Sequence, residues 1–67
     1  MNERERIGQR IAQLRTERGL TQTTLAEKAG LNQSNIWRIE NGKYSVGIDI
    51  LAKIAEALEA KVDIVKL

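Results

Sequence analysis

The strongest constraint on the fold is a pattern that occurs twice in direct succession. Residues 20–30 and residues 31–42 each begin with leucine, continue with a polar residue that can cap a helix, and end with glycine. Thr21 and Asn32 occupy the capping positions, where a side-chain oxygen accepts a hydrogen bond from the first helical turn. Glycine favours the left-handed conformation in which many helices end. The pattern predicts two short helices joined by AGLN, a turn of the length found in a helix-turn-helix.

A longer helix is predicted before this pair. Ile7, Ile11 and Leu14 recur at the spacing that places side chains on one face of a helix. Asn2 can cap this helix, and Glu5 stands at the third helical position, which is the arrangement of a capping box. The helix therefore offers one apolar face to the short pair.

A fourth helix is predicted over residues 48–58, with Gly47 as its cap. Its wide apolar stripe consists of Ile50, Leu51, Ile54, Ala55 and Leu58. Such a stripe is typical of a helix that packs against a core.

The last seven residues, 61–67, have a different character. Val62, Ile64 and Val65 are β-branched and favour an extended strand. Helical spacing also fits, because Val62 and Val65 follow Leu58 at i+4 and i+7, so a fifth helix is the alternative. We predict a strand.

Composition narrows the possible functions. The chain contains no cysteine and no histidine, which removes the thiolate, the commonest metal ligand and the commonest general base. Neither a glycine-rich phosphate loop nor a metal-binding spacing is present. We therefore expect no enzyme, no cofactor, no metal and no small-molecule ligand. The net charge of +2 and the pI of about 9.3 permit a nucleic-acid partner without requiring one.

The length and the hydropathy pattern predict a single small domain. The apolar runs are too short to span a bilayer, and the charged start MNERERIG leads into no apolar signal segment. We expect a soluble, cytoplasmic protein with no membrane partner. A chain of 67 residues has a thin core, so a partner subunit would add stability.

Residues 19–43, GLTQTTLAEKAGLNQSNIWRIENGK, resemble the helix-turn-helix of the phage-repressor-like family, known as the Xre or Cro/C1 type. The matching positions are Leu20, Gln22, Leu25, Ala26, Ala29, Gly30, Ile36, Ile39, Glu40, Asn41 and Gly42. With the flanking helices the resemblance covers residues 5–60. It implies an all-α, lambda-repressor-like bundle of four to five helices, here followed by a short C-terminal strand. In this family the second and third helices bind double-stranded DNA, with the third helix in the major groove.

The sequence departs from the family pattern at three places. Glutamate is common where Thr24 stands, so we expect the capping box of the second helix to be lost. The loop before the fourth helix usually carries a proline and a serine cap, which are replaced by Val46 and Gly47. Glycine is usual after the fourth helix, where Glu59 stands. None of these changes falls on the third helix.

The third helix has two aliphatic residues, Ile36 and Ile39, which must point inward. Its outward face carries Gln33, Ser34, Trp37 and Arg38. Gln33 can bind adenine bidentately and Arg38 can bind guanine, while the short Ser34 suits several bases. A polar helix face is more often merely solvated, but within this motif we predict base contacts.

Trp37 has two open interpretations. The indole can pack on a thymine methyl group or a sugar edge, or it can fold back over Leu20 or Tyr44 as a partly buried cover. We place it on the DNA-facing side.

Six further residues are predicted to contact phosphates: Thr21, Gln22, Asn32, Asn41, Lys43 and Tyr44. The resemblance assigns Gln22 both to a phosphate and to bracing the residue that reads bases. Thr21 opens a helix whose first amides suit an anion. Asn41 has an alternative role, which is to satisfy the end of the third helix. Lys43 carries the charge that a phosphate contact needs.

The resemblance also pairs an arginine of the first helix with the glutamate that follows the last core residue of the third. In this sequence these residues are Arg15 and Glu40, and we predict a partly buried ion pair between them. Two independent surface charges are the alternative. Such pairs specify geometry more than they add stability.

Together these features predict a DNA-binding transcriptional regulator, with a helix-turn-helix domain in residues 1–60 and a dimerisation strand in residues 61–67. It would bind a palindromic operator as a homodimer, with Val62, Ile64 and Val65 at the dimer contact. The alternative is an antitoxin that binds a toxin protein and autoregulates through DNA. A dimerisation module without DNA binding is a third possibility, against which Gln22, Gln33 and Arg38 argue.

Overall fold

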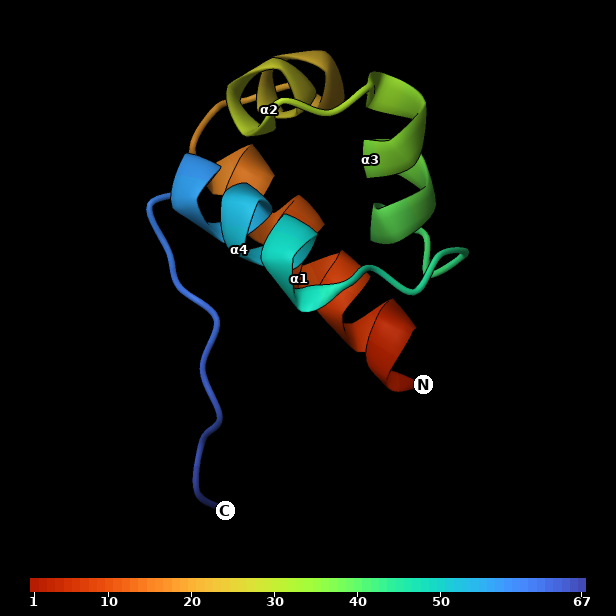
Figure 1. Cartoon of the computed structure of the whole chain (residues 1–67), viewed down its shortest axis with the longest axis vertical. Coiled ribbons are helices and arrows are strands. Elements are labelled where there is room, and N and C mark those ends of the chain that lie inside the picture. The colour runs from red at the N-terminus through yellow and green to blue at the C-terminus, as the bar shows by residue number, and fades with distance from the viewer.

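The computed structural model describes all 67 residues and contains four helices joined by short loops (Figure 1). The helices are α1 (Glu3–Glu17), α2 (Gln22–Ala29), α3 (Gln33–Glu40) and α4 (Ile48–Ala57). α3 packs against both α1 and α2, and α4 packs against α2. The predicted all-α bundle with a central helix-turn-helix is confirmed. No helix is both long enough and apolar enough to cross a membrane.

The predicted capping box of α1 is present. The Glu5 backbone N–H donates to Asn2 Oδ1 at 2.9 Å, and the Asn2 N–H donates to Glu5 Oε1 at 3.0 Å. Two of the backbone donors that a helix start leaves unpaired are thereby satisfied. This arrangement fixes the first turn of α1.

The expected loss of the capping box in α2 is wrong. The Thr24 N–H donates to Thr21 Oγ1 at 3.0 Å, and the Thr21 N–H donates to Thr24 Oγ1 at 2.8 Å. A hydroxyl oxygen accepts hydrogen bonds as a carboxylate does, so threonine serves where the family commonly has glutamate. The start of α2 therefore keeps both hydrogen bonds of a capping box.

The turn between α2 and α3 has the predicted form. Gly30 adopts the left-handed conformation at φ +71°, and the Leu31 N–H donates to the Ala26 carbonyl at 2.8 Å. Asn32 then caps α3 by accepting from the Asn35 N–H at 2.9 Å. The chain thus changes direction within a few residues, and Gln33 at the start of α3 contacts Gln22 at the start of α2.

The core lies where the four helices meet. Its buried hydrophobic residues are Ile11, Leu25, Ala26, Ala29, Ile36, Ile39, Ile54 and Leu58. Gly8 allows α1 and α3 to approach closely, because a Cβ there would overlap the carbonyl oxygens of Ile39 and Glu40. Burial of this cluster provides the main apolar contribution to folding.

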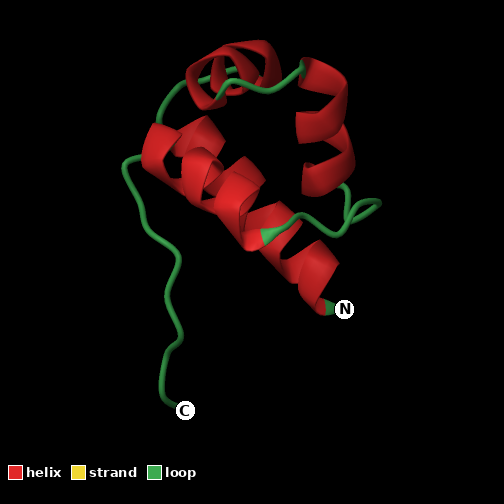
Figure 2. Cartoon of the chain, viewed as in Figure 1, coloured by secondary structure: helices red, strands yellow, loops and turns green.

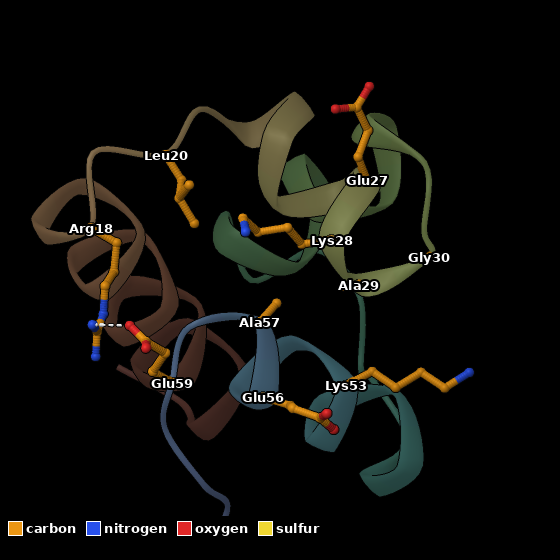
Figure 3. A pocket seen from close by; sticks show the side chains of 10 residues that line it. All are labelled: Arg18, Leu20, Glu27, Lys28, Ala29, Gly30, Lys53, Glu56, Ala57 and Glu59. Carbon is orange, nitrogen blue, oxygen red and sulfur yellow. Dashed lines mark hydrogen bonds and ion pairs between the residues drawn. The ribbon is translucent and has the colours of Figure 1, made fainter.

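α4 begins and ends close to its predicted limits. Gly47 precedes its first turn without a side-chain cap, and Leu58 follows its last residue. Glu59 then takes a left-handed conformation at φ +56°, where the family usually has glycine. Figure 3 shows the ion pair between Glu59 and Arg18, which ties the end of α4 to the end of α1.

The predicted C-terminal strand is not formed in the single chain, and neither is the alternative fifth helix. Residues 61–67 form an exposed, irregular segment after α4 (Figures 1 and 2). A strand exists only when its backbone groups pair with a neighbour, and an all-α chain offers no such neighbour. β-Branched residues favour extended backbone but do not replace the missing partner.

Candidate nucleic-acid interface

The exposed face of α3 carries all four residues that were predicted to read bases. Ile36 and Ile39 are buried as predicted, at 0% and 2% exposure. On the opposite side of the helix, Gln33, Ser34, Trp37 and Arg38 are exposed. The helix therefore presents a continuous polar and aromatic face to the outside.

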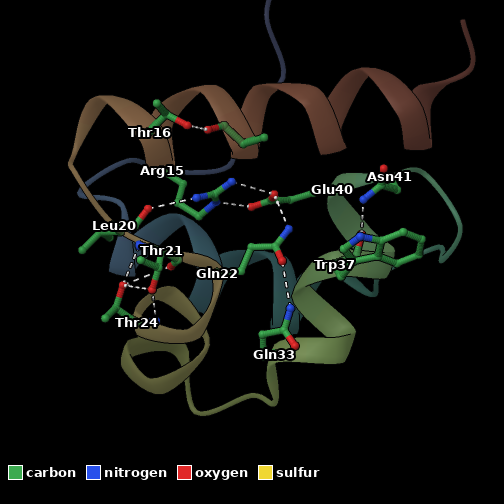
Figure 4. A network of polar contacts seen from close by, with 11 residues as sticks. Arg15, Thr16, Leu20, Thr21, Gln22, Thr24, Gln33, Trp37, Glu40 and Asn41 are labelled. Atoms are coloured by element: carbon green, nitrogen blue, oxygen red, sulfur yellow. Dashed lines mark hydrogen bonds and ion pairs between the residues drawn. The ribbon is translucent and has the colours of Figure 1, made fainter.

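Gln33 is held by a side chain of the neighbouring helix. Its Nε2 donates to Gln22 Oε1 at 2.8 Å, and Figure 4 shows this contact between the starts of α3 and α2. The bracing contact that the resemblance implied is thus present. It restricts the rotamers of an otherwise exposed side chain, which lowers the entropy lost when that side chain binds.

The predicted ion pair between Arg15 and Glu40 is also present. Arg15 Nε lies 2.7 Å from Glu40 Oε2, and Arg15 Nη2 lies 3.2 Å from Glu40 Oε1. The Glu40 side chain is 4% exposed and that of Arg15 is 19% exposed. The two parallel contacts give the pair a fixed geometry.

Two contacts of this pair were not predicted. Arg15 Nη1 donates to the Leu20 carbonyl at 2.9 Å, and Gln22 Nε2 donates to Glu40 Oε1 at 3.0 Å. Arg15, Glu40, Gln22 and Gln33 therefore form one connected network that runs from α1 through α3 and α2 to the exposed face (Figure 4). Every buried polar side-chain atom has a partner.

Ser34 and Asn32 are joined at the start of α3. The Ser34 hydroxyl donates to Asn32 Oδ1 at 2.8 Å, and the same oxygen caps the helix. The Ser34 oxygen keeps its acceptor capacity, and the Asn32 amide nitrogen has no partner within the chain. Both side chains are exposed, and both retain groups that a nucleic acid can use.

Trp37 projects outward and is 47% exposed. Figure 4 places it and Leu20 on opposite sides of the polar network, so the indole does not cover Leu20. Tyr44, in the loop after α3, is also 47% exposed. Exposed aromatic side chains beside a polar helix face are suited to contacts with bases and sugars.

Asn41 satisfies the end of α3, as its alternative role required. Its Nδ2 donates to the Trp37 carbonyl at 2.9 Å, which leaves Oδ1 and the second N–H free. Lys43 follows in an exposed loop. Neither Lys43 nor Arg38 belongs to an ion pair within the chain, so both cations are available to a phosphate or a base.

Two grooves lie away from this face. The groove in Figure 3, between the ends of α2 and α4, is lined mostly by polar and charged side chains and contains none of the predicted DNA contacts. A second groove, between α1, α4 and the tail, is lined mainly by apolar residues that include Ile7, Leu14 and Leu51. The candidate interface is therefore the exposed face of α3 with the loop that follows it.

Comparison with known proteins agrees with this geometry. The family model HTH_3, described as helix-turn-helix, matches residues 11–65. The chain belongs to this helix-turn-helix family. The match includes α2, the turn and α3 in full, which are the elements that build the candidate interface.

Relatives of this helix-turn-helix chain include the immunity repressor protein of Bacillus phage phi105, which is 45% identical over 56 residues. The transcriptional regulator SinR of Bacillus subtilis is 42% identical over 57 residues. Each alignment covers 84% of this chain, but only 39% of the phage repressor and 51% of SinR. An uncharacterised regulator of Archaeoglobus fulgidus is 35% identical, with 77% of its length covered.

Solved structures confirm the lambda-repressor-like arrangement. The restriction-modification controller protein C.AhdI of Aeromonas hydrophila superposes with a TM-score of 0.85 at 37% identity, over 88% of this chain and 86% of its own. A chain in the HipA–HipB–O2–O3 complex is 24% identical and shares the fold, with a TM-score of 0.82 over 98% of this helix-turn-helix chain.

Proposed function

We propose that this chain is a transcriptional regulator that binds a palindromic operator in double-stranded DNA as a homodimer. The observation that carries the proposal is the α3 face, where exposed hydrogen-bonding side chains sit on a helix anchored by Ile36 and Ile39. A helix fits the major groove, where every base pair presents a distinct pattern of donors and acceptors. The regulators found among the relatives support this assignment.

Phosphate contacts set the position of the domain in this proposal. They come from Thr21, Gln22, Asn32, Asn41, Lys43 and Tyr44, which lie at the start of α2, at the start of α3 and after its end. Amides at a helix start, amide side chains and a lysine all bind phosphate oxygens without reading sequence. These three sets of contacts lie around α3, so together they hold that helix against the groove.

Base contacts then provide the sequence preference. Gln33 reads adenine through N6 and N7, and Arg38 reads guanine through O6 and N7. Ser34 accepts beside Gln33, because its hydroxyl proton is donated to Asn32. Trp37 packs on a thymine methyl group or a sugar edge. Residues near the start of the recognition helix reach base edges, which is where Gln33 and Ser34 stand.

The dimer contact is assigned to residues 61–67. Val62, Ile64 and Val65 are exposed by 38%, 95% and 80%, an unfavourable arrangement for apolar side chains in an isolated chain. Pairing with the same segment of a second copy around a two-fold axis would form an antiparallel ladder. The neighbouring apolar groove of α1 and α4 would add to the buried surface.

Selection of bound sequences from a random duplex pool tests the proposal. We expect enrichment of an inverted repeat whose half-sites are centred about 10 base pairs apart, because the two recognition helices of a dimer are then one turn of B-DNA apart. We also expect log K to fall against log salt with a slope near −5 if about six phosphates are contacted. An unenriched pool with a flat salt response would contradict sequence-specific DNA binding.

An antitoxin role is the second candidate. The exposed apolar tail favours it, because the same surface can bind a different protein. Removal of residues 61–67 distinguishes the regulator from the antitoxin. A regulator that only dimerises through the tail loses operator affinity, whereas an antitoxin also loses a heteromeric partner that co-purifies with the full chain from its native host.

A further inference from the structure

The inner end of the polar network consists of a side chain that can only accept hydrogen bonds. Glu40 is buried, and its two oxygens accept from Arg15 Nε and Nη2 and from Gln22 Nε2. A carboxylate has no proton to donate. The Gln22 amide must therefore turn its NH2 group toward Glu40 and its carbonyl oxygen away from it.

The orientation of the Gln22 amide in turn fixes the orientation of the Gln33 amide. With its NH2 group directed at Glu40, Gln22 offers only its oxygen to Gln33, which donates to it from Nε2 at 2.8 Å. Gln33 then has its Oε1 and one remaining N–H for a base. One acceptor and one donor complement adenine, which presents the N6 amino donor and the N7 acceptor in the major groove. Guanine presents two acceptors there and leaves Oε1 without a partner.

We propose that Glu40 determines the base preference of Gln33, because it fixes the direction of the hydrogen bonds that pass through Gln22. Glu40 is then a positioning residue, since it reaches no base and acts through two amides. The inference rests on the proposed function, to which it adds a specificity determinant in the interior. The network then transmits the direction of its hydrogen bonds to Gln33 as well as supporting the fold.

The substitution Glu40→Gln is expected to reverse the relay. Arg15 Nε forms the shorter contact, at 2.7 Å to Oε2, whereas Arg15 Nη2 lies 3.2 Å from Oε1. We expect the remaining oxygen of the new amide to stay at the Oε2 position, with loss of the longer contact from Nη2. The new NH2 group would then occupy the Oε1 position and donate to Gln22 Oε1. Gln22 would donate to Gln33 in turn, and Gln33 would present its NH2 group outward. Two donors complement guanine rather than adenine.

Competition between two duplexes tests the proposal. The duplexes differ at one base pair, A·T or G·C, at the position where Gln33→Ala abolishes the wild-type preference. We expect the wild-type chain to prefer adenine by about tenfold, the scale of one bidentate contact, and Glu40→Gln to bring this ratio to one or below. The ratio does not move if Glu40 only supports the fold, because lost stability weakens both complexes equally.

Glu17→Gln is the matched control, since Glu17 is an exposed carboxylate of α1 outside the network. It should leave the ratio unchanged. Gln22→Met keeps the ion pair but removes the relay, so it should bring the ratio toward one even if Glu40→Gln fails to fold. Thermal melting shows whether each variant is folded.

The outcomes separate this inference from the proposed function. A folded Glu40→Gln or Gln22→Met variant that retains the wild-type preference for adenine would overturn the relay while leaving sequence-specific binding intact. A wild-type chain without preference at any base pair would contradict the proposed function itself.

Discussion

Gly8 of α1 lies so close to Glu40 of α3 that a Cβ on Gly8 would be 2.7 Å from the Glu40 carbonyl oxygen. The Ile39 carbonyl would be closer still. This close approach brings the two helix backbones together beneath the polar network. The backbone position of Glu40, the inner end of the network, therefore depends on the absence of a side chain at Gly8.

We therefore expect Gly8→Ala to destabilise the fold. The added methyl group meets backbone atoms that cannot move aside independently, and overpacking of this kind costs about 1–3 kcal/mol in the free energy of unfolding. In a domain of this size, each kcal/mol lowers the melting temperature by about 4–8 °C. Gln9→Ala, at the next and exposed position of α1, is the control and should change the free energy by less than about 0.5 kcal/mol. Equal melting temperatures for the two variants would show that α1 and α3 can move apart to accommodate the methyl group without loss of stability.

Replacement of Glu59 by glycine is expected to stabilise the fold. Its left-handed conformation costs a residue with a side chain roughly 1–2 kcal/mol, and its exposed ion pair with Arg18 returns at most about 1 kcal/mol. Glu59→Gly should therefore raise the free energy of unfolding by a few tenths to about 1 kcal/mol. Glu59→Ala removes the ion pair and keeps the strain, so it should be less stable than Glu59→Gly in denaturant unfolding. The reverse order would contradict the strain argument.

Much of the fold could be predicted because helix limits depend on neighbours in the sequence. Asn2, Thr21 and Asn32 each cap a helix through a hydrogen bond to a residue three positions later, so their roles are visible locally. Gly30 and Gly42 adopt left-handed conformations that few other residues accept. The capping role of Thr24 was not predicted, because the family commonly has glutamate at this position. The threonine hydroxyl accepts the same hydrogen bond from the Thr21 N–H.

Tertiary contacts that the family resemblance did not imply were not visible in the sequence. The close approach at Gly8 depends on which part of α3 crosses α1, and periodicity does not reveal that. The hydrogen bond from Gln22 to Glu40 joins residues 18 positions apart, and it exists only after α2 and α3 have docked. The strand that was predicted for residues 61–67 could not form at all within one chain, because these residues have no pairing partner anywhere in their own chain.

Arg38 and Lys43 should respond differently to truncation, since one is assigned to a base and the other to a phosphate. Arg38→Ala should cost roughly 1–3 kcal/mol on the preferred site and relax the preference at one base pair of each half-site. Lys43→Ala should weaken binding to all duplexes alike and reduce the salt slope by about one for each phosphate that is no longer neutralised. Binding isotherms on a panel of single-base variants at two salt concentrations distinguish the two effects. If Arg38→Ala weakens every duplex equally, Arg38 binds a phosphate.

Removal of residues 61–67 tests the assignment of the tail to dimerisation. None of these residues is buried, and the buried core lies entirely within residues 11–58, so the truncated chain should keep its helical content. In sedimentation experiments at micromolar concentration we expect the full chain to be a dimer and the truncated chain a monomer. Operator binding should weaken strongly, because two linked half-sites add an avidity of about 10²–10⁴ that a monomer cannot use.

Two substitutions in the full-length tail separate apolar packing from chain length. Ile64→Ser removes a side chain that is 95% exposed in the single chain, and it should shift the equilibrium toward monomer if that side chain is covered in the dimer. Lys66→Ser, a polar position in the same segment, should leave the dimer intact. A truncated chain that stays dimeric and binds the operator as before would rule out the tail as the dimer interface. The apolar groove of α1 and α4 would then be the surface to mutate, beginning at Leu14 and Leu51.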